Sequence, residues 1–235
     1  MQFRLPRTRN AATAFAVISI VTSVVWYLLS KSTGVMLYLV PADVLGLQLW
    51  QLITFIPATQ GPSPVLFGAF IIWSIGGSLE GLWGTRKFLS FTLGVTFTAG
   101  LLTVLTAWLA GGFFLTMRYF GTGVLSSILW VAYGLALWSR EMSFFGFPLT
   151  GRTFAVIGVL FTALQAVFGG GAAVIAEIFG LALTFLYVRW ASPHDLWLRF
   201  QSWRLRKQLK SRSSHLEVIS GSKGEAPRGS DKYLH

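Results

Sequence analysis

Few side chains in this sequence can take part in chemistry, and the main candidates lie in apolar surroundings. Thr122, Ser126 and Ser127 lie close together in one apolar stretch, and Glu177 is an isolated acid in another. A hydroxyl becomes a nucleophile when a general base lies within hydrogen-bond reach, and a carboxyl group can take up a proton or contact a polar partner. These residues are therefore candidates for nucleophilic chemistry, proton binding or polar recognition.

Composition excludes several other kinds of site. The chain has no cysteine, so disulfides, thiolate metal sites and a cysteine nucleophile cannot form. The 3 histidines, His194, His215 and His235, all follow the last apolar stretch, and the aspartates lie outside these stretches. Phosphate-binding and dinucleotide-binding glycine patterns are absent. We expect no metal site, no cofactor and no aspartyl-type catalytic pair.

The candidate residues belong to a chain with the composition of a membrane protein. Of its 235 residues, 54% are hydrophobic and only 11% are charged, whereas about a quarter of the residues in soluble domains are charged. A membrane-spanning helix needs about 20 apolar residues. The sequence predicts six spans, at residues 11–30, 64–83, 88–110, 120–138, 153–168 and 172–190. The expected fold class is therefore all-α, a polytopic bundle of six transmembrane helices.

Three regions are predicted along the chain. Residues 1–10 form a basic cytoplasmic N-terminus, residues 11–190 the membrane domain, and residues 191–235 a basic cytoplasmic tail. The tail is expected to be helical to about residue 211 and then disordered, because its end is rich in Ser, Gly, Lys and Glu. Between the first two spans, residues 31–63 are too apolar for a plain loop, so we expect short helices at the membrane interface there.

Basic residues orient the predicted spans. With a cytoplasmic N-terminus, 17 Lys and Arg fall on the cytoplasmic side and only 2, Lys31 and Arg118, on the opposite side. Without the long tail, the partition is still 7 against 2, as the positive-inside rule requires. Both termini are therefore predicted to be cytoplasmic. The net charge of +11 is ascribed to this topology and to attraction to anionic membrane lipids, and we expect no nucleic-acid partner.

Small residues predict which spans touch. Span four contains Gly121, Gly123 and Gly134, and span six has a small residue at every fourth position, namely Ala172, Ala176, Gly180 and Thr184. Small residues let helix backbones approach closely in a membrane. Spans four and six are therefore expected to be in contact.

Glu177 allows two interpretations. It is predicted near the middle of span six, where an ionised carboxylate is costly and polar residues face a cavity or a partner. In one interpretation it binds a proton or a polar part of a substrate. In the other it is a protonated structural residue bonded to a neighbouring span, with Thr122, Ser126 and Ser127 of span four as available partners.

Two segments resemble the rhomboid family. The run from Leu49 to Phe55 (LWQLITF), which includes Trp50, is similar to the membrane-embedded first loop of that family. The run from Gly77 to Leu89 (GSLEGLWGTRKFL) is similar to its G-x-x-L-E-x-x-x-G-x-x-R/K-F-L signature between the second and third helices. The structural residues of this motif are Glu80, Gly84 and Arg86, and we expect Glu80 and Arg86 to form an ion pair or to cap the next helix.

The resemblance implies serine proteolysis within the membrane, but the catalytic positions differ. Active rhomboids use a serine in G-x-S-G at the start of span four and a histidine in A-H-x-x-G of span six. Here the serine position holds Thr122 or Gly123, depending on the register, and Glu177 stands in place of the histidine. The second-helix residues associated with the oxyanion site would fall near Pro64 and Gly68. A serine–histidine dyad is therefore not expected.

These departures predict a catalytically inactive rhomboid-like protein, a pseudoprotease, that binds or chaperones transmembrane proteins. Its lateral face near spans two and five is the entry gate implied by the resemblance. Runs 79–84 and 138–141 are similar, among inactive relatives, to the Golgi rhomboid-like transmembrane family. One alternative is an active intramembrane serine protease in which Ser126 or Ser127 is a displaced nucleophile, and another is a small transporter that uses Glu177. The expected location is a bacterial inner membrane.

Overall fold

The computed structural model of the chain describes residues 10–33, 36–59, 61–144, 147–169 and 174–189. Apart from residue 10, the predicted N-terminal region and the predicted tail lie outside the described residues. The long helical segments are α1 (Asn10–Thr33), α4 (Pro62–Ile71) continued by η1 (Ile72–Gly76) and α5 (Gly77–Trp83), α6 (Thr85–Ala110), α8 (Gly121–Ala136), α9 (Gly151–Gly169) and α10 (Ile175–Arg189).

Four of these helical segments are long and apolar enough to cross a membrane, namely α1, the segment Pro62–Trp83, α6 and α9. Helix α8 is apolar but has 16 residues, and α10 has 15, whereas a span ordinarily needs about 20. Each of the six stretches predicted from the sequence therefore coincides with a helical segment, and four of the six meet the length and hydropathy expected of a span.

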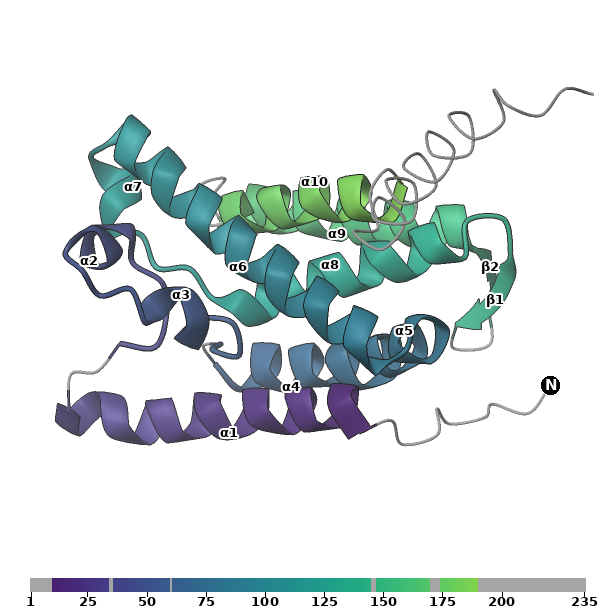
Figure 1. The fold of residues 1–235 in the computed structure, drawn as a ribbon, viewed down its shortest axis with the longest axis horizontal. Coiled ribbons are helices and arrows are strands. Elements are labelled where there is room, and N and C mark those ends of the chain that lie inside the picture. The colour runs from purple at the N-terminus through teal and green to yellow at the C-terminus, as the bar shows by residue number, and fades with distance from the viewer. Residues whose placement is uncertain (1–9, 34–35, 60, 145–146, 170–173, 190–235) are drawn as a thin grey trace, which may run out of the picture. The chain divides into compact units, whose positions relative to one another are not determined.

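Helix α8 lies at the centre of the bundle. It packs against α9, α10 and α4, while α1 lies beside α4. Figure 1 shows α1 and α4 on one side and α9 and α10 on the other, with α6 and α8 between them. Most residues along α8 are buried, including polar Thr122 and Ser127. A hydroxyl on this helix is therefore surrounded by protein on several sides.

The predicted contact between spans four and six is confirmed. Helices α8 and α10 pack together, and a Cβ atom added at Gly180 would come within 2.9 Å of the Ile128 side chain and 3.0 Å of the Val124 side chain. The absence of a side chain at Gly180 is what permits this approach. Glu177, one turn earlier on α10, is thereby carried against α8.

The segment after α1 contains the predicted short helices, α2 (Pro41–Leu45) and α3 (Gln51–Thr54). Gln51 holds them together, because its Oε1 accepts a hydrogen bond from Val40 N–H at 2.9 Å and its Nε2 donates to Gln48 Oε1 at 3.0 Å and to Asp43 Oδ2 at 3.3 Å. Trp50, which belongs to the run similar to the rhomboid first loop, is half exposed, whereas the neighbouring Gln51 is fully buried. The position of α2 and α3 at the membrane interface stays a prediction.

The turn between α5 and α6 depends on Gly84 and Glu80. Gly84 has a φ of 81°, which side-chain-bearing residues rarely adopt. Glu80 is buried, and its Oε1 and Oε2 accept hydrogen bonds from Thr85 Oγ1 at 2.6 Å and from Ala12 N–H at 2.9 Å. In the described part of the chain no ion pair joins Glu80 to Arg86, which is exposed. Glu80 thus links the start of α6 to the first turn of α1.

A two-stranded hairpin departs from the all-α expectation. Strands β1 (Glu141–Phe144) and β2 (Phe147–Thr150) pair antiparallel between α8 and α9, with Glu141 opposite Thr150. Two four-residue strands carry too little alternation of apolar and polar residues to signal a hairpin in the sequence. The hairpin connects the end of α8 to the start of α9, which pack closely from that point on.

Candidate functional site

The candidate residues of spans four and six meet at one cavity. It has a volume of about 630 Å³ and lies between α4, α8, α9 and α10. Its lining includes Thr122, Ser126 and Ser127 from α8 and Glu177 from α10. The structure therefore brings together all four residues singled out from the sequence. The remaining wall is mostly apolar, and it contains Phe67 of α4 and Phe161 of α9.

Three buried side chains form a hydrogen-bonded chain across three helices at this cavity. Ser127 Oγ donates to Glu177 Oε2 at 3.0 Å, and Thr162 Oγ1 of α9 donates to Ser127 Oγ at 3.0 Å. The Thr162 hydroxyl also lies 3.3 Å from the carbonyl oxygen of Gly158. Glu177 is only 7% exposed, so its carboxyl group receives from Ser127 a hydrogen bond that water would otherwise supply.

Thr162 is the member of this chain that the sequence did not single out. Its only sequence signal is a polar side chain in an otherwise largely apolar span, and Gln165, which lines the cavity, gives the same signal. Most hydroxyls in such positions bond their own helix backbone. The role of Thr162 becomes visible only when α9 is packed against α8.

Thr122 and Ser126 have different roles from Ser127. Thr122 Oγ1 lies 3.2 Å from the carbonyl oxygens of both Pro57 and Ala58, so it ties the start of α8 to the preceding loop. Ser126 Oγ donates to the Thr122 carbonyl of its own helix at 2.8 Å. Neither hydroxyl is bonded to Glu177 in the described contacts, and Ser127 is the hydroxyl that the fold places against the carboxyl group.

Glycines make room for this arrangement. A Cβ atom added at Gly123 would lie 2.8 Å from Glu177 Oε1, so the carboxyl group occupies the space that a side chain would need. At Gly68 of α4, an added Cβ would collide with the Thr122 methyl group. Gly123 is one of the two residues assigned to the serine position, and its lack of a side chain leaves room for the Glu177 carboxyl group.

The first N–H groups of α8 are already bonded. Gly121 N–H donates to the Phe55 carbonyl at 2.9 Å, and Thr122 N–H donates to the Ala58 carbonyl at 3.3 Å. Leu39 and Tyr119 form an antiparallel bridge just before this helix. Tyr119 is buried there, and burial raises the pKa of its phenol. Free N–H groups at such a site would stabilise an oxyanion in acyl transfer, whereas these two hold the loop.

The elements of catalysis are thus only partly present. Ser127 and Glu177 have the separation of a hydroxyl and a base, but both are buried and Thr162 shares the hydroxyl. All the histidines of the sequence lie outside the described residues, and in the residues that are described no three His, Asp or Glu side chains cluster as metal ligands. The site is best suited to hydrogen bonding with a polar group that enters the cavity.

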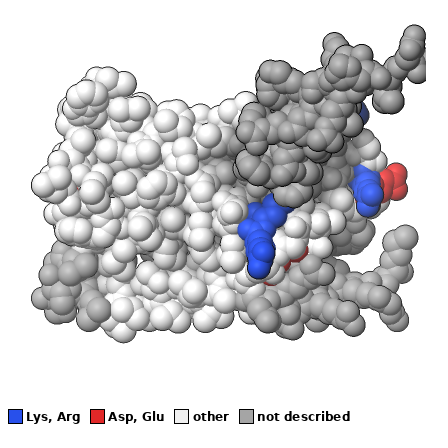
Figure 2. All heavy atoms as spheres, viewed as in Figure 1, with Lys and Arg blue, Asp and Glu red and all other residues white. Residues whose placement is uncertain are grey.

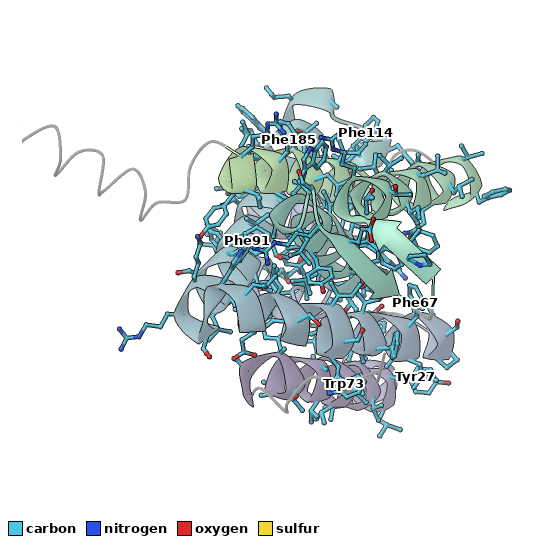
Figure 3. The ribbon with its side chains drawn as sticks, turned by 90° about the vertical axis from the view of Figure 1, so that its right-hand side faces the viewer. Tyr27, Phe67, Trp73, Phe91, Phe114 and Phe185 are labelled. Carbon is cyan, nitrogen blue, oxygen red and sulfur yellow. The ribbon has the colours of Figure 1, made fainter. Side chains whose placement is uncertain are left out.

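An aromatic pair lies between α4 and α9 at the cavity. The ring centroids of Phe67 and Phe161 are 5.9 Å apart and the rings are tilted by 38°. Both side chains are nearly half exposed, at 44% and 46%. Figure 3 labels Phe67, the α4 member of the pair. The two rings therefore belong both to the cavity lining and to the exposed surface of the bundle.

Comparison with known families finds a match, whereas a search of curated proteins finds none. Residues 12–201 match the model described as "Eukaryotic integral membrane protein (DUF1751)", a stretch that contains every residue of the cavity. A eukaryotic family argues against the bacterial inner membrane expected from the sequence, so that expectation is corrected. The match extends over most of the chain, and this protein therefore belongs to the eukaryotic integral membrane protein family DUF1751.

Proposed function

We propose that this protein is a catalytically inactive rhomboid-like membrane protein that binds or chaperones other membrane proteins. The observation that carries the proposal is the Ser127–Glu177 contact, 3.0 Å long and buried, at the place where a rhomboid would have its base. A carboxyl group held by a serine and a threonine, in spans without histidine, offers a polar contact to a partner. It lacks the dyad that would cleave one.

The proposal includes six spans with both termini cytoplasmic. Cations at the ends of the described helices support this topology. Arg86 and Lys87 lie at the start of α6, Arg152 at the start of α9 and Arg189 at the end of α10, whereas Arg118 precedes α8 at the other end. Figure 2 shows one face of the protein, on which the Lys and Arg residues, in blue, lie toward one side. Under the positive-inside rule, that side is cytoplasmic.

The position of Phe67 and Phe161 supports a lateral entry for the partner. Helix α9 packs chiefly on α8, and the contact between the two rings is an aromatic bridge from α9 to α4. Such a pair contributes about 0.5 to 1.5 kcal/mol beyond its area burial, so rotation of the two side chains would open the cavity at little cost. A transmembrane segment with a polar residue could then reach Glu177.

Photo-crosslinking tests this role. A benzoylphenylalanine at position 161, on the protein in its own membrane, should capture membrane proteins more strongly than one at Phe97 of α6, a matched exposed phenylalanine. Capture should survive Ser126→Ala, because binding needs no nucleophile and Ser126 bonds only its own helix. Equal capture at positions 161 and 97 would show only random neighbours in the bilayer and would contradict the proposal.

The Ser127–Glu177 distance also favours a second candidate function, hydrolysis by a serine–carboxylate pair. A fluorophosphonate probe separates the two functions, with an active rhomboid as the positive control. We expect no labelling of this protein. Labelling that is lost in Ser127→Ala and retained in Ser126→Ala would identify Ser127 as a nucleophile and overturn the pseudoprotease proposal.

A further inference from the structure

Two arginines from different helices face one tryptophan ring. Trp138 follows α8, Arg152 is the second residue of α9 and Arg189 is the last residue of α10. The guanidinium carbons of Arg152 and Arg189 lie 5.2 Å and 5.8 Å from the centre of the Trp138 ring. Arg189 also lies 5.9 Å from the ring of Phe185, one turn earlier on α10. We name Trp138, Arg152 and Arg189 the arginine–tryptophan cluster.

Close helix packing fixes this cluster at one end of the bundle. A Cβ atom added at Gly134 of α8 would lie 2.6 Å from the backbone nitrogen of Ala155 on α9. The Gly151 N–H, at the start of α9, donates to the Arg140 carbonyl at 3.1 Å. The end of α8 and the start of α9 are therefore held together, and Arg189 reaches the same ring from α10.

The positive charge of the cluster is not neutralised by the described residues. A cation over an aromatic ring is stabilised, but its charge remains. Within the described ranges neither Arg152 nor Arg189 forms an ion pair, and Glu141 of β1, the acid nearest to Arg152 along the chain, is exposed. Two guanidinium groups that face one ring repel each other, so an anion between or beside them would lower the free energy.

Chemistry and position select the anion. Guanidinium groups match the paired oxygens of phosphate, and the positive end of the α9 dipole also favours an anion beside its first turn. Tryptophan is a residue of the membrane interface, and the cluster lies at the ends of three helices of a membrane protein. The phosphate layer of a lipid leaflet lies at that depth.

We propose that the arginine–tryptophan cluster binds the phosphate headgroup of an anionic phospholipid. Arg152 and Arg189 hold the phosphate oxygens, and Trp138 keeps the two arginines apart and in place. This site is separate from the cavity of Glu177, and its occupation requires neither partner binding nor catalysis.

Native mass spectrometry of the full chain in detergent tests the site. Phosphatidic acid should remain bound, while phosphatidylcholine with the same acyl chains should not. At roughly 1 kcal/mol for each basic residue, Arg152→Gln or Arg189→Gln should weaken retention about fivefold, and the double variant about thirtyfold. A double variant that retains phosphatidic acid as the parent protein does would overturn the proposal.

The matched control is Arg86→Gln with Lys87→Gln. It removes the same charge from the start of α6, where Lys87 alone lies over a ring, 5.4 Å from the centre of Trp83. We expect less than about a twofold loss, because the site is local and not a product of overall charge. An equal loss in both double variants would refute the site. Displacement of phosphatidic acid by equimolar inorganic phosphate would refute the lipid as its ligand.

Discussion

Hydroxyl side chains inside this protein behave in two ways, as α6 and the cavity show. On α6, Thr96, Thr103 and Thr106 each donate to the carbonyl four residues earlier, at 2.7 Å, 2.8 Å and 2.8 Å. At the cavity, Ser127 bonds across helices to Glu177 and Thr162 bonds across helices to Ser127, although the Thr162 hydroxyl also lies 3.3 Å from the Gly158 carbonyl of its own helix. All five side chains are hydroxyl donors, and what differs at the cavity is a buried carboxyl group that competes with the backbone for the Ser127 hydroxyl. A hydroxyl in a span is thus informative only together with its acceptor.

Among the variants that test this comparison, removal of the Glu177 carboxyl group should have the largest effect on stability. Glu177→Ala leaves the Ser127 hydroxyl without its acceptor and enlarges the cavity. We expect a loss of about 3 kcal/mol in the free energy of unfolding, combining a lost buried hydrogen bond with a new void. Thermal unfolding of the purified protein in detergent measures it. An unchanged melting temperature would show that the hydrogen-bonded chain across α8, α9 and α10 contributes nothing to stability.

Glu177→Gln is the control for that variant. Its amide oxygen can still accept from Ser127, so the loss should be below about 1 kcal/mol. A loss as large as that of Glu177→Ala would mean that the site requires the carboxyl group itself and not only an oxygen that accepts from Ser127.

The two adjacent serines provide the second test. Ser127→Ala removes the link between Thr162 and Glu177, and we expect a loss of about 1 to 1.7 kcal/mol, the upper range for hydrogen bonds between membrane helices. Ser126→Ala removes only a bond to its own helix and should be nearly neutral. The same thermal unfolding assay applies to both variants. A greater loss for Ser126→Ala would reverse the assignment of the two hydroxyls.

Much of the helix arrangement was predictable from the sequence because it depends on composition and residue spacing. Each predicted span coincides with a helical segment, and the small residues around Gly180 indicated the contact of α10 with α8. The resemblance pointed to Glu80 and Gly84, and the structure adds a partner for Glu80 that it did not suggest, Ala12 of α1. This bond joins positions 68 residues apart, so no local pattern could reveal it.

The details of the site could not be predicted in the same way. Adjacent residues on a helix point about 100° apart, so a choice between Ser126 and Ser127 requires the rotation of α8 about its axis. That rotation is set by neighbours, including Gly121, where an added Cβ would lie 2.6 Å from the Ile56 Cα. Thr162 required knowledge of which face of α9 meets α8. Sequence analysis therefore indicated the right cavity residues and a set of three possible partners for Glu177, but neither which of the three bonds it nor the contribution of Thr162.

The smallest expected effect belongs to α6 and completes the comparison. Thr103 is buried, and its hydroxyl donates to the Ala99 carbonyl at 2.8 Å. Thr103→Val keeps the shape of the side chain and removes only this bond, and the Ala99 carbonyl retains its place in the helix. We expect a change of at most about 0.6 kcal/mol, the average for side-chain hydrogen bonds in membrane helices. Thermal unfolding of Thr103→Val, measured beside Ser127→Ala, tests this expectation. Equal losses of stability in the two variants would mean that hydrogen bonds between helices contribute no more to this fold than hydrogen bonds within one helix.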